Sequence, residues 1–416
     1  MQRRQFLTSA CAALVASSPG ALAAAERDRV AGDGLAGSPA GAAPTPTAAV
    51  FASPSSLAPI RASADRIIAL SVCTRPFRAQ GPRIEAERVG RKTVVHNYGH
   101  GGSGWSLSWG SAALALELVQ ATREKSIAVI GCGAIGLTTA ITAQRAGLRV
   151  RIYARDRPPD VASTFASGVW SPESRVCTAE YATPEFERRW ETMARTSFRI
   201  YQTMLGLPGT PIEWHDGYAL SDVPFGQGGG GRENGEPAYP ALEWRLLRDL
   251  RPRSQRLAPG EHPFAVPYVA RYTRMMFNIS AYSRMLMEDF LRNGGQIETR
   301  AFASPREFAT LREKTIVNAT GYGARRLLGD DSITPVRGQT ARLIPQPEVT
   351  YGLYYEQKDL FVVPRRDGIL VQMQMPGDFG NPDAVPDRAT SEAAVAHVAA
   401  LFASRASVQS APAGVR

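Results

Sequence analysis

Lysine, cysteine and histidine are all scarce in this chain of 416 residues. Only four of its 48 basic residues are lysines, and the arginines are scattered without forming a run. The formal net charge of +10 therefore indicates arginine-rich, solvated surfaces and no nucleic-acid partner. No internal repeat is present. With 44% hydrophobic and 21% charged residues, the chain is expected to be globular and long enough for one large interleaved domain.

The few cysteines and histidines argue against a metal site. Three cysteines follow the N-terminal segment, an odd number without metal-ligand spacing, and they are expected to be buried small hydrophobes: Cys73, Cys132 and Cys177. His96 and His100 are four residues apart, but they lie on a glycine-rich loop without a carboxylate nearby in sequence. Metal binding is the poorer interpretation of this pair.

The N-terminus has the pattern of an export signal. Arg3 and Arg4 precede an apolar stretch too short to span a bilayer, and small residues follow up to Ala25. Residues 1–25 are therefore predicted to be a twin-arginine signal peptide, read by the twin-arginine export machinery, with a periplasmic or secreted product and no stable membrane anchor. Residues 26–60 are rich in Ala, Pro, Gly and Ser and predict a disordered linker. The folded unit is expected at 61–403, with a tail at 404–416.

A strand, glycine turn, helix and second strand are predicted from Ile127 to Asp156. Gly131 suits the tight turn, Gly133 lets a pyrophosphate approach the backbone, and Gly136 allows close packing of helix and strand. Phosphate charge is favoured at the helix N-terminus. Three glycines alone are a weak signal, but the flanking strands and helix are present at the right spacing. The segment therefore favours a dinucleotide site over a structural turn.

Two segments before this unit are also informative. Arg75 and Arg78 flank Pro76 at the end of a predicted strand that starts near Arg66. They suit either a forked donor for a carboxylate or two surface arginines, and spacing does not decide between these. The glycine-dense loop 96–106 opens onto a helix predicted at 109–122 and offers a second set of backbone N–H groups for a ligand.

The remaining chain alternates helices with strands. Helices are predicted at 184–205, from Ile279 to the Gly294–Gly295 pair, and at 388–402, with a flexible loop at 227–236. Strands are predicted at 296–302 and 314–318, followed by an antiparallel set at 336–344, 349–355, 360–364 and 368–373.

Together these segments resemble the FAD-dependent D-amino-acid and D-aspartate oxidases. Residues 166–172 are similar to the family's Ala-Gly-Leu-Trp-Gln-Pro loop, and residues 316–324 to its Val-Asn-Cys-Thr-Gly turn. Pro335-Val-Arg-Gly-Gln339 matches closely. The nine residues His-Asn-Tyr-Gly-His-Gly-Gly-Ser-Gly at 96–104 are the most specific match. The resemblance implies an α/β fold in which a Rossmann-like FAD-binding domain is interleaved with an antiparallel-sheet substrate domain.

The order of these motifs departs from the family. The arginine strand and the 96–104 loop lie near the family's C-terminus, whereas here residues 65–117 precede the nucleotide unit. This order resembles a circular permutation, with the old ends joined through residues 118–126 and new ends cut between the closing helix and the Arg66 strand. Permutation succeeds where termini are close and exposed.

The resemblance also implies roles for individual residues. Arg75 would clamp the substrate carboxylate and the Gly102 carbonyl would receive the amine. Ser171 and Phe361 would face the substrate, and because Phe361 replaces a family tyrosine, Tyr354 or Tyr355 is expected to supply the hydroxyl. The implied FAD contacts are Gly101, Gly102, Gly104, Trp105, Ser106, Gly131, Gly133, Ala134, Ile135, Gly136, Arg155, Asp156, Ser163, Thr164, Ser167, Gly168, Phe302 and Thr320.

The implied activity is oxidative deamination of D-amino acids. FAD takes a hydride from the substrate Cα, so no general base is needed among the five histidines. The products would be a 2-oxo acid, ammonia and, with O2 as acceptor, hydrogen peroxide. Two alternatives remain open: a periplasmic dehydrogenase that passes electrons to a quinone, and an exported flavin- or amino-acid-binding module without turnover. A homodimer is one option for the assembled protein.

Overall fold

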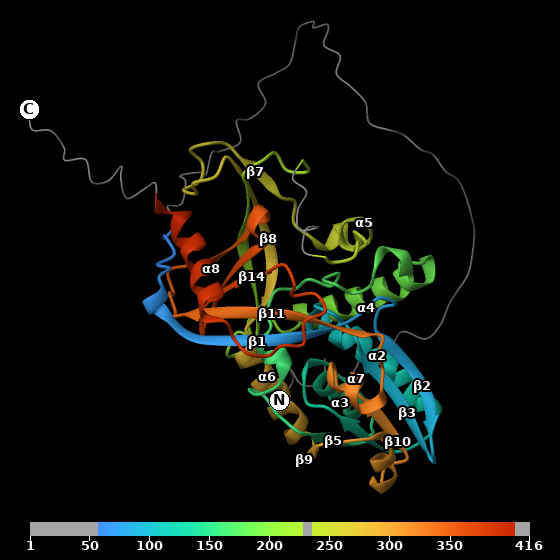
Figure 1. The fold of residues 1–416 in the computed structure, drawn as a ribbon. Coiled ribbons are helices and arrows are strands. Elements are labelled where there is room, and N and C mark those ends of the chain that lie inside the picture. The colour runs from blue at the N-terminus through green and yellow to red at the C-terminus, as the bar shows by residue number, and fades with distance from the viewer. Residues whose placement is uncertain (1–56, 228–234, 404–416) are drawn as a thin grey trace, which may run out of the picture. The chain divides into compact units, whose positions relative to one another are not determined.

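The computed structural model describes residues 57–227 and 235–403, which fall within one compact unit that starts at Ser56 (Figure 1). The predicted signal peptide, nearly all of the linker, the tip of the 227–236 loop and the tail lie outside the described residues. The predicted boundary between linker and folded unit at residue 61 is too late. Ile60 is only 3% exposed and packs into the core beside the partly buried Leu57.

A six-stranded sheet contains the predicted nucleotide unit. Its order is β2 (Arg83–Val89), β3 (Lys92–Tyr98), β10 (Thr315–Asn318), β4 (Ser126–Ile130), β5 (Arg149–Ala154) and β9 (Gln296–Thr299). All neighbours are parallel except β2, which runs antiparallel to β3. The Rossmann-like strand, turn, helix and strand are therefore confirmed at β4, α3 (Ala134–Arg145) and β5. The flanking β3 comes from the segment that precedes this unit in the chain.

The second sheet has eight strands. Its order is β1 (Ile67–Arg78), β11 (Ile333–Leu343), β14 (Gly368–Met373), β13 (Leu360–Arg365), β12 (Tyr351–Tyr355), β6 (Ile212–Ser221), β8 (Tyr268–Phe277) and β7 (Gln255–Leu257). The predicted antiparallel set is confirmed, because β11, β14, β13 and β12 pair antiparallel to one another. The unpredicted β6 joins this set by pairing with β12 in parallel. Strands β6 and β8 were not predicted. Polar residues such as Asp216 and Arg271 interrupt the alternation on which strand prediction depends.

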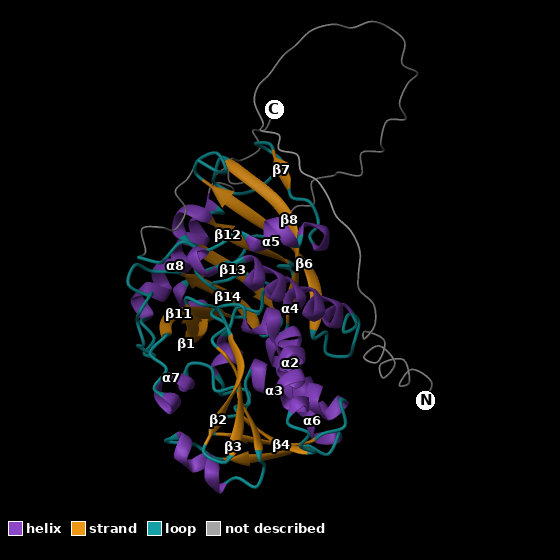
Figure 2. Cartoon of the chain, turned by 90° about the vertical axis from the view of Figure 1, so that its right-hand side faces the viewer, coloured by secondary structure: helices purple, strands orange, loops and turns teal. Residues whose placement is uncertain are grey.

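Helices fill the space beside the six-stranded sheet (Figure 2). They are α2 (Gly104–Ala121), α4 (Pro184–Gln202) and α6 (Ile279–Arg292), together with α3. The shorter helices are α5 (Leu242–Leu246) and α7 (Gly323–Leu328). Helix α2 begins five residues before the predicted start at 109, directly after the glycine loop. It packs against both α3 and α4, and the backbone of Met193 lies so close to Gly110 that a side chain there would overlap it.

The closing helix α8 (Arg388–Ala400) covers strands β11 and β14. It also contacts the 3-10 turn Ala64–Arg66 that leads into β1. The start of β1 and the last helix are therefore neighbours.

Within residues 57–227 and 235–403, no helix combines the length and apolar character needed to cross a bilayer.

The residues before the nucleotide unit supply strands to both sheets. In the large sheet, β1 pairs with β11 along its whole length, with Cys73 opposite Gly338 and Arg75 opposite Val336. In the other sheet, β3 pairs with β10.

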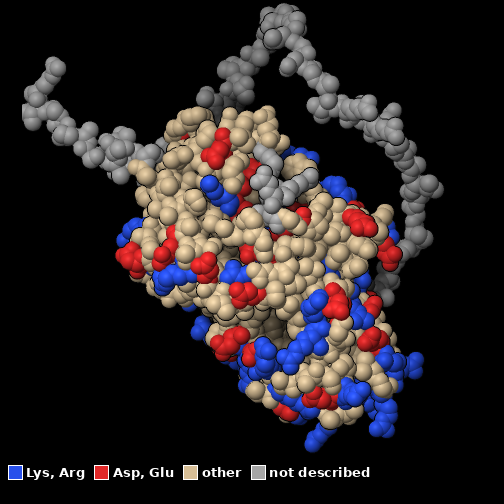
Figure 3. All heavy atoms as spheres, viewed as in Figure 1, with Lys and Arg blue, Asp and Glu red and all other residues tan. Residues whose placement is uncertain are grey.

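Cys132 and Cys177 are buried and Cys73 is partly buried, and all three are free thiols. Figure 3 shows basic and acidic side chains interspersed over one face of the molecule.

Candidate functional site

A cavity of about 1780 Å³ lies at the carboxyl ends of β4, β5 and β10 and extends along one face of the large sheet. Ligands of open α/β sheets bind beyond the carboxyl ends of the strands. Most of the predicted site residues line this cavity, although they come from segments throughout the sequence. The pairing of β1 with β11 and of β3 with β10 brings these distant segments of the chain together at one site.

The turn between β4 and α3 forms the nucleotide end of the cavity. Gly133, Ala134 and Ile135 line it, so the N-terminus of α3 faces the space where a phosphate would lie. Gly136 does not line the cavity. A Cβ on Gly136 would overlap the carbonyl oxygen of Gly131, so only glycine lets the helix begin this close to the turn.

Residues at the ends of β5 and β10 continue this wall. Arg155 and Asp156, directly after β5, form an exposed ion pair with a nitrogen–oxygen distance of 2.7 Å. Phe302 lies edge-on to Tyr153 with ring centroids 6.1 Å apart. The Thr320 hydroxyl, after β10, donates to Asn318 Oδ1 over 2.8 Å. Except for Asn318, all of these residues line the cavity and offer both polar and aromatic contacts to a nucleotide.

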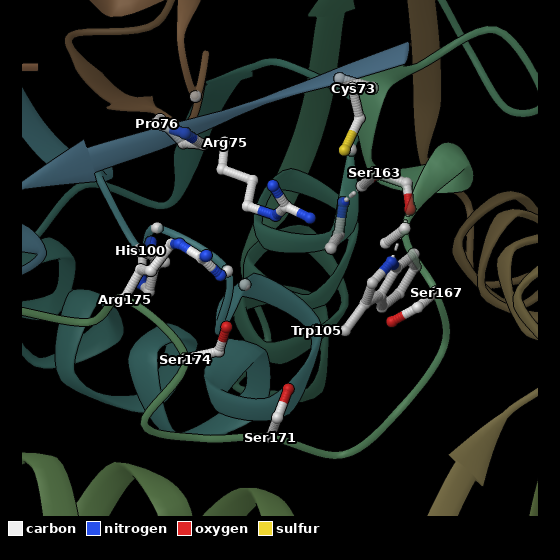
Figure 4. Close-up of a pocket in the computed structure, with 18 of the residues that line it drawn as sticks. Cys73, Arg75, Pro76, His100, Trp105, Ser163, Ser167, Ser171, Ser174 and Arg175 are labelled. Atoms are coloured by element: carbon white, nitrogen blue, oxygen red, sulfur yellow. Dashed lines mark hydrogen bonds between the residues drawn. The ribbon is translucent and has the colours of Figure 1, made fainter. Parts of the chain in front are cut away.

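The glycine loop before α2 is held by the loops that follow β5. The Gly102 N–H donates to the Ser174 carbonyl over 2.9 Å, and the Trp105 indole N–H donates to the Ser163 carbonyl over 2.7 Å (Figure 4). Gly101 has a φ of +55°, and a Cβ there would overlap the carbonyl oxygen of Arg175. Because Ser163 also accepts from the N–H of Ala134 over 3.1 Å, these loops and the α3 N-terminus form one connected surface.

His100 in this loop has a structural role. Its Nε2 lies 2.8 Å from Ser111 Oγ, and burial lowers the pKa of His100 to about 3. The ring is therefore neutral at physiological pH. It holds the loop against α2 through its hydrogen bond with Ser111.

Arg75 projects from β1 into the cavity (Figure 4). Its Nη1 donates to the Arg337 carbonyl over 3.0 Å and to Gln374 Oε1 over 3.3 Å. Both terminal nitrogens lie over Gly338, at 2.6 Å from where a Cβ would stand. Within the described residues no carboxylate pairs with this guanidinium, and burial lowers the pKa of Arg75 without neutralising it. The site therefore presents a held positive charge that lacks a protein counter-ion.

An aromatic pair forms the neighbouring part of the wall. Phe361 on β13 lies opposite Tyr354 on β12, and their rings stack with centroids 4.4 Å apart. Both line the cavity. The expectation that Tyr355 contacts the substrate is wrong, because alternate residues of a strand face opposite sides. The Tyr355 hydroxyl donates to Asp222 over 2.8 Å, outside the cavity.

Two other residues that were predicted to contact FAD, Thr164 and Ser106, do not line the cavity. The Thr164 hydroxyl donates to the Val161 carbonyl over 2.7 Å, and Ser106 Oγ accepts from the Ser171 N–H over 2.8 Å. Both support cavity-lining loops without reaching the cavity. Four residues that line the cavity were not predicted from the sequence: Gln374, Asp359, Arg175 and Tyr272. Only Gln374 had a sequence signal, since it is a polar residue that follows a mainly apolar strand.

We expect Gly136→Ala to weaken FAD binding by roughly 5- to 100-fold, because the added methyl forces the α3 N-terminus away from Gly131 at an overpacking cost of about 1–3 kcal/mol. The measurement is FAD content and affinity from flavin absorbance and fluorescence. Thr142→Ala is the matched control, since this residue lies on the same helix and its hydroxyl donates only to the Thr138 carbonyl. Full FAD occupancy in Gly136→Ala at low FAD would contradict this role.

Comparisons with known proteins agree with this geometry. Residues 126–416 match the family described as DAO, FAD dependent oxidoreductase. A D-amino-acid oxidase of Rubrobacter xylanophilus is 28% identical over 279 residues, covering 66% of this chain and 76% of that protein. One of Streptomyces coelicolor is 28% identical over 224 residues, covering 52% of this chain and 58% of that protein.

Among solved structures, iminodiacetate oxidase from Chelativorans sp. BNC1 matches with a TM-score of 0.43 and 15% identity, covering 66% of this chain and 78% of that one. L-amino acid deaminase from Proteus vulgaris matches with a TM-score of 0.41 and 13% identity, covering 60% and 61%. Because the family model spans more than half of the chain, this protein belongs to the DAO family of FAD-dependent oxidoreductases, and its cofactor is FAD.

Proposed function

We propose that this protein oxidatively deaminates D-amino acids. The observation that carries the proposal is Arg75, a guanidinium without a protein counter-ion in the wall of the cofactor cavity. A planar guanidinium held by two acceptors is suited to a bidentate pair with a substrate carboxylate. The two bacterial relatives named D-amino-acid oxidase support the same substrate class.

The protein's contribution to the reaction is binding, orientation and exclusion of water. Arg75 fixes the carboxylate, the carbonyl of Gly102 accepts a hydrogen bond from the amine, and the stacked rings of Phe361 and Tyr354 form an aromatic wall of the cavity that excludes water. When bound, FAD supplies the hydride acceptor for the substrate Cα–H and is reoxidised by O2. The overall reaction consumes a D-amino acid, water and O2, and yields a 2-oxo acid, ammonia and hydrogen peroxide.

Oxygen is the acceptor that we propose, because the relatives that the chain resembles are named oxidases. A dehydrogenase that passes electrons to a quinone would use the same cavity residues. Stoichiometric hydrogen peroxide under air supports the oxidase. Turnover with an artificial dye and without peroxide would establish the dehydrogenase.

We expect Arg75→Ala to keep its bound FAD and to lose kcat/KM for D-amino acids by roughly 30-fold to several thousand-fold, because the substrate carboxylate then has no charged partner. Steady-state kinetics beside the flavin spectrum tests this. Arg78→Ala is the control, since Arg78 donates to the Gly81 carbonyl and to Ser332 outside the cavity. Unchanged kinetics of Arg75→Ala on every D-amino acid would overturn the assignment.

We also propose that the chain is a circular permutation of the family. Three observations support it. The family model matches only from residue 126 onward, although β1 and β3 are integral to the two sheets. Helix α2 leads into β4 through four residues, 122–125. The turn at Ala64–Arg66, which leads directly into β1, contacts the closing helix α8.

A chain rearranged to begin at Ser126, with residue 403 joined to residue 60 by a flexible Gly-Ser linker, is expected to fold, bind FAD and retain kcat/KM within about threefold. The reason is that every strand pairing and the cavity are preserved when only the connection changes. Linkers of several lengths control for strain at the new joint. Failure of all of them to bind FAD would argue against this relation.

Finally, we propose export in the folded state through the twin-arginine machinery, to the periplasm or beyond. The support is the Arg3-Arg4 pair in the sequence together with a cofactor cavity built from distant segments, which favours folding around FAD before transport. Replacing both arginines by lysine is expected to retain active flavoprotein in the cytoplasm of the producing cell. Undiminished export of the lysine variant would contradict this route.

A further inference from the structure

Asp359 occupies an unusual position in the cavity wall. It follows the 3-10 turn Glu356–Lys358 between β12 and β13 and has a φ of +41°, in the left-handed region. Aspartate and asparagine tolerate this region better than other side chains that carry a Cβ. Its backbone carbonyl accepts from the Gln374 N–H over 3.1 Å. No hydrogen bond or ion pair from the described residues reaches its carboxylate, which faces the cavity.

Several other acidic groups in this wall or directly behind it already have partners. Glu236 forms a two-point ion pair with Arg175, with distances of 2.8 and 2.6 Å. Glu243 pairs with Arg251 at 3.1 Å, and Glu173 accepts from the Glu243 backbone N–H over 2.6 Å.

Two acidic residues of the described wall, Asp160 and Asp359, have no hydrogen bond or ion pair to their carboxylates. Asp160 lies in the loop after β5, at the nucleotide end of the cavity, whereas Asp359 lies beside Gln374. Burial raises the pKa of Asp359, which shows that its charge is poorly solvated.

Gln374 connects the backbone of Asp359 with Arg75. Its side-chain oxygen accepts from Arg75 over 3.3 Å, while its backbone N–H donates to the backbone carbonyl of Asp359. Arg75 and Asp359 are not within ion-pair distance of each other, so the two charges flank Gln374 as separate groups. A ligand with a carboxylate at one end and a cation at the other matches this pair of charges.

The wall beside Asp359 is aromatic. Phe361 follows it by two residues and stacks on Tyr354, and Tyr272 also lines the cavity. Aromatic faces bind methylene groups and attract cations. The candidate cation for an acidic ligand side chain is Arg274, whose buried Nη2 has no hydrogen-bond partner among the described residues. Its Nη2 lies against the backbone at Gly352 and its guanidinium over the ring of Tyr272, and these contacts hold it in place.

We propose that Asp359 determines substrate specificity, and that the preferred substrates are D-amino acids with a positively charged side chain, such as D-lysine or D-ornithine. This inference rests on the proposed function, in which Arg75 binds the α-carboxylate. The ammonium group of the side chain supplies the partner that Asp359 lacks in the protein.

The test compares D-lysine, D-norleucine and D-glutamate as substrates of the holoenzyme. D-Norleucine has nearly the same shape as D-lysine but carries no side-chain charge. In the wild type, kcat/KM for D-lysine is expected to exceed that for D-norleucine by roughly 10- to 100-fold, as for a hydrogen-bonded charge pair. In Asp359→Asn, this ratio falls to near one. Asparagine suits the left-handed backbone, so the substitution removes charge while preserving the turn.

Asp222→Asn is the matched control, because Asp222 bonds Tyr355 outside the cavity. This variant is expected to keep the wild-type ratio. A ratio that is unchanged in Asp359→Asn would overturn the assignment of Asp359. A wild-type preference for D-glutamate would overturn it as well and point to Arg274.

A binding experiment separates this inference from the proposed reaction. 6-Aminohexanoate has a carboxylate and a distal ammonium but no amine on the carbon next to the carboxylate, so it is expected to bind without α-deamination. Perturbation of the flavin spectrum is expected to show tighter binding of 6-aminohexanoate than of hexanoate, and Asp359→Asn is expected to remove the difference. If that holds while no D-amino acid reacts, the charge site stands and the proposed reaction fails. If D-amino acids react but 6-aminohexanoate binds no tighter than hexanoate, the reaction stands and the Asp359 assignment fails.

Discussion

The pairing of β1 with β11 is the interaction on which the site depends. It places Cys73 opposite Gly338 and sends the Arg75 side chain across the glycine, where the Arg337 carbonyl and Gln374 hold it. A guanidinium so held costs free energy unless an anion compensates it, and the described residues provide none. The strand that carries Arg75 and the strand that receives it are more than 250 residues apart in sequence, so the large sheet must form before the clamp exists.

The nucleotide half of the fold was predictable because its signals are local. Strand, glycine turn, helix and strand follow each other within 30 residues, and the structure has them as β4, α3 and β5. Strands β6 and β8 escaped prediction because polar residues such as Asp216 and Arg271 interrupt the regular alternation of apolar and polar residues. The parallel pairing of β12 with β6 could not be predicted from the sequence, because tertiary packing sets the order of strands in a sheet.

Among the site residues too, those with a local sequence signal were predictable, and those that depend on tertiary packing were not. Gly131, Gly133 and Arg75 were identifiable from motifs, and all three line the cavity. The choice between Tyr354 and Tyr355 required the register of β12, which decides the face that each ring occupies. Asp359 required knowledge of which charges are paired. We propose a role for it because Arg175 and Glu236, which are 61 positions apart, form an ion pair with each other and leave the Asp359 carboxylate without one.

We propose that the cavity holds FAD and that Arg75 positions a D-amino acid for oxidation. Anaerobic titration of the purified flavoprotein with matched D- and L-amino acids tests this most directly, because bleaching of the flavin absorbance reports hydride transfer independently of the electron acceptor. We expect the D-enantiomers to bleach the flavin and their L-counterparts to leave it oxidised. An oxidised flavin with every D-amino acid, or bleaching by L-amino acids alone, would contradict it.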